Sequence, residues 1–142
     1  MPTKNKVFID SNFFIYLFDK GEKKKRQHCS KLLVKLESTH SIVISTQVIK
    51  EISSVLLRKF QYPVSDLKIF IGQLEKFEVA ETPATVIQKG LDILSSYQLS
   101  FWDSIICATA ASANCRLIIS EDMQDGQEIL GMKIQSPFSL KI

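Results

Sequence analysis

Lys6-Val7-Phe8-Ile9-Asp10 is followed by Ser11-Asn12. The run Val7-Phe8-Ile9 is apolar on both faces that a β-strand would present, which is typical of a strand buried within a sheet. Ser11 and Asn12 are residue types that commonly begin helices, so a short helix over residues 13–18 is expected next. A buried strand that leads directly into a helix is the unit from which parallel sheets are built.

The same alternation of apolar runs and helical patterns continues along the chain. Further strands are predicted at Ser41–Ser45, Phe77–Ala80 and Arg116–Ser120, with a short last one at Lys133–Gln135. Further helices are expected to begin within residues 21–26, at Thr46 as the cap, at Pro63, at Pro83 and at Ser100. This order predicts an α/β fold with a parallel sheet of about five strands, flanked by helices on both faces. Residues 1–142 are expected to form a single domain.

Composition narrows the class of protein. The 142 residues carry a formal net charge of +3, which permits a polyanionic partner without requiring one. The three cysteines form no CxxC pair and are odd in number, so we expect free thiols in a reducing cytoplasm and no zinc site or disulfide framework. No apolar run approaches the length that spans a bilayer, so no membrane association is expected.

Four acidic residues occupy positions that point toward one edge of the predicted sheet. Asp10 closes the first strand, and Asp122 follows the strand at residues 116–120. Ligands of open α/β sheets bind beyond the carboxyl ends of the strands, so both acids are expected there. Glu51 borders the apolar stripe of its helix, and Asp103 heads an apolar helix face. Because both helices are expected to begin at that edge, the four carboxylates are predicted to converge.

Carboxylates brought together in this way repel one another unless a cation compensates their charge. Mg²⁺ or Mn²⁺, bound through oxygen ligands, is the usual partner, and such a site hydrolyses phosphodiesters with an activated water. Neither His28 nor His40 falls where it could act as a base instead. Each acid taken alone could merely cap a helix or turn, or lie on a helix surface. It is the agreement of all four that favours a metal site.

Four stretches of the chain resemble the PIN domain, specifically the toxin ribonucleases of VapBC-type toxin–antitoxin pairs. They are Val7–Asn12, Val48–Ile52, Leu99–Ala108 and Leu117–Gly126, in the family's order and at similar separations. The resemblance implies a PIN-like three-layer sandwich, dependence on Mg²⁺ or Mn²⁺, and endonucleolytic cleavage of RNA. It also implies a cognate antitoxin protein as partner, and a homodimer.

By position, the resemblance assigns the catalytic and metal-binding roles to Asp10, Glu51, Asp103 and Asp122. It implies polar supporting residues beside them, namely Asn12, Ser120 and Asp125. The fourth acid is the family's least fixed position. Glu121 or Asp125 therefore remains an alternative that could share or replace the role of Asp122.

The densest cationic run is Lys23-Lys24-Lys25-Arg26. It could bind RNA phosphates, since phosphate neutralisation supplies affinity that does not depend on base sequence. The alternative is a solvated segment that opens a helix, as charge runs commonly do.

Other classes of α/β protein fit the sequence less well. A receiver-like regulatory module that binds Mg²⁺ without nuclease activity should carry a lysine where Ser120-Glu121-Asp122 stands. A phosphatase of the haloacid-dehalogenase kind needs a second aspartate where Asp10-Ser11-Asn12 has Asn12. No GxGxxG motif follows any strand, which disfavours a dinucleotide-binding domain. A PIN nuclease outside a toxin–antitoxin pair stays open beside the toxin hypothesis.

Overall fold

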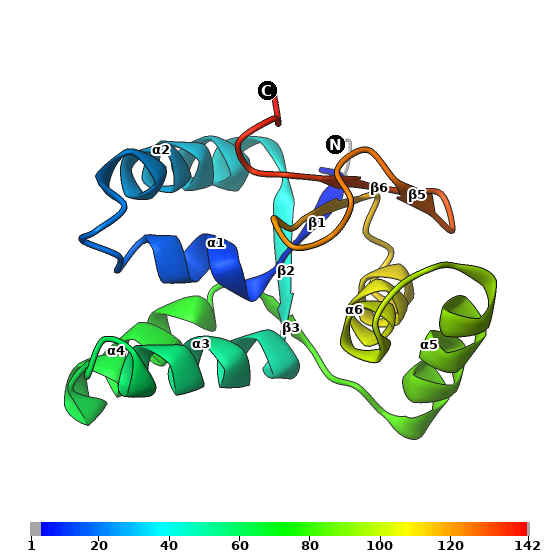
Figure 1. Ribbon diagram of the computed structural model, residues 1–142, viewed down its shortest axis with the longest axis horizontal. Helices are drawn as coiled ribbons and strands as arrows, with labels where there is room; N and C mark the ends of the chain where they lie inside the picture. The colour runs from blue at the N-terminus through cyan, green and yellow to red at the C-terminus, as the bar shows by residue number, and fades with distance from the viewer. Residues whose placement is uncertain (1–3, 142) are drawn as a thin grey trace.

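Strands and helices alternate along residues 4–141, the part of the chain described by the computed structural model (Figure 1). The strands are β1 (Lys6–Ile9), β2 (Ser41–Ser45), β3 (Glu78–Ala80), β4 (Leu117–Ile119), β5 (Glu128–Ile129) and β6 (Met132–Gln135). The helices are α1 (Ser11–Tyr16), α2 (Lys23–Thr39), α3 (Thr46–Arg58), α4 (Val64–Leu74), α5 (Ala84–Ser96) and α6 (Phe101–Ser112). Each strand and helix predicted from the sequence is present.

All six strands join in one sheet with the order β3-β2-β1-β4-β6-β5. Five of them are parallel, and only the two-residue β5 runs antiparallel to its neighbour β6. The predicted parallel sheet of about five strands is therefore confirmed, with β5 added at its edge. The order also separates the fold from receiver domains, whose flavodoxin-like sheet places β1 between β2 and β3. Here β1 lies between β2 and β4.

The hairpin that joins β5 to β6 was not predicted. Leu130 and Gly131 both have positive φ angles, 50° and 79°, as in the tight turns that connect antiparallel strands. Leucine seldom occupies such a position, so the usual Asn-Gly or Asp-Gly signal of a hairpin is absent from the sequence. The second strand then continues as Met132–Gln135, one residue longer than expected.

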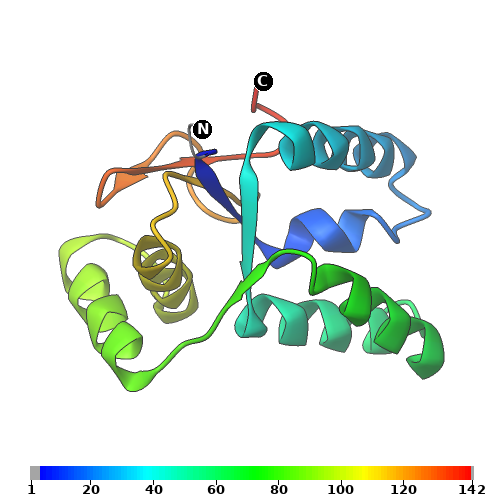
Figure 2. The same cartoon turned by 180° about the vertical axis from the view of Figure 1, so that it is seen from behind.

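Helices cover both faces of the sheet. Figures 1 and 2 show α1, α2, α3 and α4 on one side, and α5 and α6 on the other. The result is the three-layer α/β/α arrangement that was expected. The helix pair α5–α6 packs closely because Gly90 on α5 has no side chain. A Cβ at this position would lie only 2.7 Å from the Ile105 Cδ1 atom.

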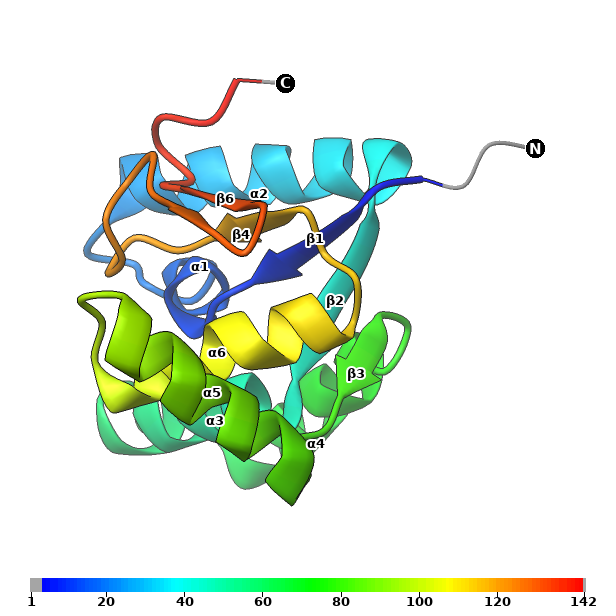
Figure 3. The ribbon, with the colours of Figure 1, turned by 90° about the vertical axis from the view of Figure 1, so that its right-hand side faces the viewer.

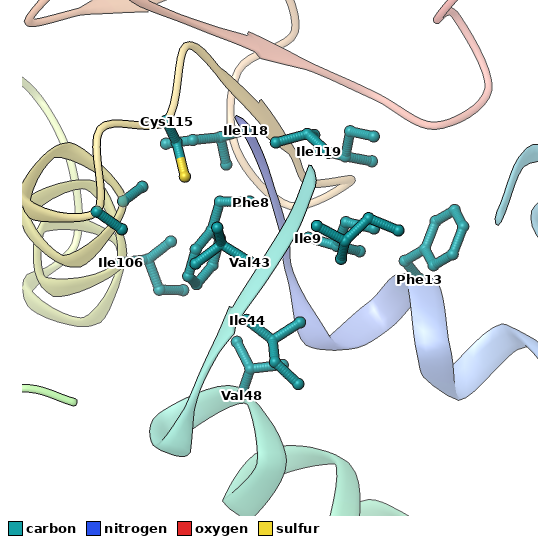
Figure 4. Packing of buried hydrophobic residues seen from close by; sticks show 14 of the residues in the cluster. Phe8, Ile9, Phe13, Val43, Ile44, Val48, Ile106, Cys115, Ile118 and Ile119 are labelled. Atoms are coloured by element: carbon teal, nitrogen blue, oxygen red, sulfur yellow. The ribbon is translucent and has the colours of Figure 1, made fainter. Parts of the chain in front are cut away.

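Apolar side chains of the central strands pack in opposite directions, which holds the two helical layers to the sheet. In Figure 4, Phe8 lies on the side of Ile106, which belongs to α6, whereas Ile9 lies on the side of Phe13, which belongs to α1. Phe8 and Ile9 are fully buried, and Phe13 is nearly so. Burial of one such side chain stabilises the fold by roughly 1.5–3 kcal/mol. The carboxyl end of β1 is therefore held rigidly where Asp10 begins.

Two predicted helix starts are wrong: α1 runs over Ser11–Tyr16 with Asp10 as its cap, where a helix over residues 13–18 is expected, and α3 begins one residue early. The cap of α3 is Ser45 and not Thr46: the Ser45 hydroxyl accepts a hydrogen bond of 3.1 Å from the backbone N–H of Val48. Ser45 is the last residue of β2 and is buried, and its hydroxyl caps the helix that follows. Among residues 4–141, no helix combines the length and the apolar character needed to cross a bilayer.

Candidate active site

The carboxyl end of β1 and the first turns of α1 and α6 lie on the same side of the molecule, at the left in Figure 3. The loop that follows β4 reaches that side as well. This is the edge at which parallel α/β sheets bind ligands. The topology therefore brings the segments that carry Asp10, Asp103 and Asp122 to one edge, as predicted.

Asp10 is the most deeply buried acid of this edge, with 4% of its surface exposed. Its Oδ1 atom accepts a hydrogen bond of 2.7 Å from the backbone N–H of Ser11, and its Oδ2 atom accepts one of 2.9 Å from the Ser120 hydroxyl. Burial raises the pKa of Asp10 to about 6, since the two hydrogen bonds only partly offset it and negative charge on Glu51 and Asp103 adds to it.

Glu51 is fixed from two sides. Its Oε2 atom accepts a hydrogen bond of 2.8 Å from the Ser11 hydroxyl, and its Oε1 atom accepts one of 3.1 Å from the side-chain amide of Gln47. Gln47 precedes Glu51 by one turn of α3, where side chains four residues apart meet. Ser11 thus contacts Asp10 through its backbone and Glu51 through its side chain, which links the acid of β1 to the acid of α3.

Asp103 lies in the first turn of α6, and its backbone N–H donates a hydrogen bond of 3.1 Å to the capping hydroxyl of Ser100. Its carboxyl group is half-buried, and burial raises its pKa. A hydrogen bond with Ser100 opposes that shift, while negative charge on Asp122 and Glu51 reinforces it. Asp103 is therefore close enough to both acids to sense their charge.

Asp122 lies beside α1. The side-chain amide of Asn12, which the resemblance placed beside the acids, donates a hydrogen bond to the Asp122 Oδ2 atom. Ser120, a second implied support, donates a hydrogen bond to Asp10. Asn12 and Ser120 therefore each contact one of the four acids, and their supporting role stays a prediction.

The two alternatives to Asp122 have other partners. Glu121 accepts a hydrogen bond from the Tyr16 hydroxyl and forms an ion pair with Lys25. Asp125 accepts hydrogen bonds of 2.8 Å from the Ser136 backbone N–H and 3.0 Å from the Ser139 hydroxyl. These bonds lower the pKa of Asp125 and stabilise a turn in the C-terminal segment. The side chain of Asp125 is therefore bound to that turn, and none of its hydrogen bonds within residues 4–141 leads toward the other acids.

A hard divalent cation suits the chemistry of this group. The side-chain atoms that these four acids could offer to a cation are all carboxylate oxygens, which Mg²⁺ and Mn²⁺ prefer. Burial raises the pKa values of Asp10 and Asp103, and repulsion among the acids adds to this effect; a bound cation would relieve that repulsion. Within the described part of the chain, no three acidic, histidine or cysteine side chains already form a closed metal-binding group. The four acids influence one another's charge but do not form a closed set of ligands, so direct metal coordination stays a prediction.

The run Lys23–Arg26 forms the first turn of α2. Lys23 and Lys24 are exposed, whereas Lys25 and Arg26 are half-buried. Lys25 is engaged with Tyr16 and Glu121, so Lys23 and Lys24 are the more accessible cations. Contact of this run with RNA stays a prediction.

Two supporting residues were missed from the sequence. Ser11 and Gln47 are not among the site residues that the sequence predicts. Gln47 could have been found from its spacing, since it lies four residues before Glu51 on the same helix. The contact between Ser11 and Glu51 joins residues 40 positions apart and carries no local signal.

Comparison with known proteins agrees with the fold and the order of these elements. No curated protein sequence matches the chain. Among solved structures, a toxin–antitoxin complex from Klebsiella pneumoniae is similar with a TM-score of 0.70 at 20% identity, covering 94% of this chain and 99% of that one. VapBC2 from Rickettsia felis, bound to a DNA fragment from its promoter, is similar with a TM-score of 0.66 at 17% identity over 92% and 98%.

The Mycobacterium tuberculosis toxin VapC20, described as cleaving the sarcin–ricin loop, is similar with a TM-score of 0.61 at 15% identity over 82% and 91%. At such identities the likeness is one of fold. The family model of the PIN domain matches residues 7–124, a span that begins inside β1 and ends two residues after Asp122. The chain therefore belongs to the PIN domain family.

Proposed function

We propose that this protein is a metal-dependent endoribonuclease that hydrolyses RNA phosphodiester bonds with Mg²⁺ or Mn²⁺. The observation that carries the proposal is the buried Asp10, whose pKa is raised to about 6 in an electrostatically coupled group of four acids. Perturbed carboxylates gathered at one edge are typical of catalytic sites. Membership of the PIN family supports a nuclease-type hydrolase.

The chain's own residues would hold and orient the reacting groups. Asp10 would be the central acid, held by Ser11 and Ser120, and Glu51 would approach it from α3. Asp103 and Asp122 would complete the site from α6 and from the loop after β4. A divalent cation bound there would polarise the phosphodiester and lower the pKa of a bound water.

The buried charge of Asp10 also explains why a cation would bind. With no cation, Asp10 retains its proton to a higher pH than an exposed aspartate does, because burial and its neighbours disfavour the ionised form. Release of that proton would accompany cation binding. Affinity for the metal is therefore expected to rise with pH up to about the pKa of Asp10.

A role as the toxin of a type II toxin–antitoxin pair is the second part of the proposal. It is supported by the similar folds of a toxin–antitoxin complex from Klebsiella pneumoniae and of VapBC2 from Rickettsia felis. We propose a cognate antitoxin as partner, a homodimeric assembly and a cytoplasmic location. The exposed Lys23 and Lys24 would contribute to binding of the RNA backbone. The alternative within the same family is a PIN nuclease without an antitoxin.

The purified chain should be incubated with a panel of single-stranded and structured RNAs in Mg²⁺, in Mn²⁺ and in EDTA. Two variants should be tested in parallel: Asp103→Asn, and Asp92→Asn as a control at an exposed acid of α5. Cleavage that needs metal, is abolished by Asp103→Asn and survives Asp92→Asn would support the proposal. Equal cleavage by the parent and Asp103→Asn would refute the assignment of the site. A folded parent that neither cleaves RNA nor binds Mn²⁺ would refute metal-dependent catalysis altogether.

A further inference from the structure

Glu121 is held by two side chains from different helices. The Tyr16 hydroxyl, on α1, donates a hydrogen bond of 2.5 Å to the Glu121 Oε1 atom. The Lys25 Nζ atom, on α2, lies 3.7 Å from the Glu121 Oε2 atom and donates a hydrogen bond of 3.3 Å to the Tyr16 hydroxyl. Each of the three polar groups therefore contacts the other two, which leaves Glu121 little freedom to turn elsewhere.

The C-terminal segment closes over this contact. The ring of Phe138 packs edge-on against Tyr16 with centroids 5.6 Å apart, and Lys25 Nζ lies 5.1 Å from the Tyr16 centroid and 5.4 Å from that of Phe138. Partial burial of this kind strengthens both the hydrogen bond and the ion pair. The α1–α2 segment, the loop after β4 and the C-terminal segment thus meet around Tyr16 and Lys25.

The next residue, Asp122, behaves differently. It accepts its hydrogen bond from Asn12, one helical turn before Tyr16 on α1. Its charge adds to the effect of burial on the pKa of Asp103, whereas the charge of Glu121 adds to the effect of burial on the pKa values of the Tyr16 hydroxyl and the Cys29 thiol. Asn12 is adjacent to Ser11, which contacts both Asp10 and Glu51, so Asp122 is bound beside two of the predicted metal ligands, whereas Glu121 is bound one turn further along α1.

We propose that Tyr16 is a positioning residue: together with Lys25 it binds Glu121 and so holds the loop after β4 in the orientation that presents Asp122 to the other acids. The inference rests on the proposed function, since it concerns the same site. Without the Tyr16 hydroxyl, Glu121 is free to compete with its neighbour for the cation, and the loop has two acids but no preferred one. The hydrogen bond between Tyr16 and Glu121, outside the site, thereby determines that Asp122 is the fourth acid.

The test is Mn²⁺ binding to the full chain, measured by titration calorimetry without RNA. Three variants answer the question: Tyr16→Phe, Glu121→Ala and the double variant. Tyr62→Phe is the matched control, because Tyr62 is also a half-buried aromatic that packs edge-on against another ring, that of Phe18, and its hydroxyl has no hydrogen-bond partner in residues 4–141. Thermal unfolding of every variant in EDTA reports loss of stability separately.

We expect Tyr16→Phe to weaken Mn²⁺ binding about tenfold, the lower end of the effect of removing an outer partner of a metal ligand. Tyr62→Phe should leave the affinity unchanged. Because Tyr16 acts through Glu121, Tyr16→Phe should have no further effect in the Glu121→Ala background.

Two results would overturn the inference while the proposed function stands. One is a Tyr16→Phe variant that binds Mn²⁺ within about twofold of the parent, even if it melts earlier, because Tyr16 would then be only structural. The other is a weakening of the same size with and without Glu121, which would mean that Tyr16 acts by another route. A parent that binds no Mn²⁺ would remove both the proposed function and the inference.

Discussion

Replacement of Asp10 by asparagine should stabilise the metal-free protein at neutral pH. The pKa of Asp10 is raised from 3.8 to about 6 in the folded state, chiefly by burial. Between pH 4 and 6 the folded protein therefore binds more protons than the unfolded chain, and its stability falls as pH rises through this window. Above it, ionised Asp10 costs the folded state about 3 kcal/mol, since each unit of pKa shift corresponds to about 1.4 kcal/mol. Asparagine has nearly the same shape and carries no charge, so it avoids this cost.

The measurement is urea denaturation of the parent and Asp10→Asn in EDTA at two pH values. At pH 7.5 the variant should be more stable by up to about 3 kcal/mol, or roughly 10 °C in Tm for a chain of this length. At pH 4.5 the difference should shrink to about 1 kcal/mol, because most of the parent's Asp10 is then protonated. Asp92→Asn, at an exposed acid, should show no such pH-dependent gain.

Bound metal should make the parent more stable relative to Asp10→Asn. At a concentration of Mn²⁺ about 100 times its Kd, the parent gains about 2.7 kcal/mol, whereas the variant gains little because its central ligand is lost. RNA cleavage by Asp10→Asn should be undetectable. A variant that is no more stable than the parent at pH 7.5, or that gains equally at both pH values, would refute the view that buried charge at Asp10 destabilises the apo protein.

Further predictions test the contacts around the site and the fold itself. Ser11→Ala removes the hydroxyl that orients Glu51. It should reduce RNA cleavage tenfold or more, which is the usual effect of removing a residue that binds a metal ligand from outside. Ser54→Ala, at an exposed serine on the same helix as Glu51, should leave the rate unchanged. Equal rates for the two variants would show that the Ser11 hydroxyl is dispensable. A Cβ at either Gly131 or Gly72 meets no atom within 4 Å, but only Gly131 has a positive φ, of 79°. Gly131→Ala should therefore cost about 1–2 kcal/mol, and Gly72→Ala, in helix α4, should gain up to about 1 kcal/mol by urea denaturation; shifts of the same sign would contradict the backbone argument.

Apolar periodicity predicted the central part of the fold well because the parallel strands are buried on both faces. Ser41–Ser45 is the strand β2 at its predicted bounds, and the strand at β1 differs only by the terminal Asp10. Periodicity could not predict β5, because a two-residue strand has no period. Its turn is formed by Leu130 in a conformation that leucine seldom adopts, so only the tertiary structure stabilises it.

The placement of the four acids could be predicted from where they follow strands or begin helices, but their hydrogen-bond partners could not, and their roles as ligands stay a prediction. Asp10 and Asp103 have the burial and raised pKa expected of site residues, and the choice among Glu121, Asp122 and Asp125 needed side-chain contacts. Asp125 illustrates the reason. Its two hydrogen bonds reach Ser136 and Ser139, whose nearness to it depends on how the chain returns after β6.

The short helix α1 explains how so many acids are held at one edge. Its apolar residues Phe13 and Phe14 are 2% and 1% exposed, and their burial fixes the helix against the sheet and α3. Its polar residues are consequently fixed too: Ser11 contacts Asp10 and Glu51, Asn12 contacts Asp122, and Tyr16 contacts Glu121. Since these donors stay in place when a carboxylate is replaced by its amide, loss of an acid should remove metal binding without disturbing its neighbours. Loss of a buried phenylalanine should instead displace all of these contacts together.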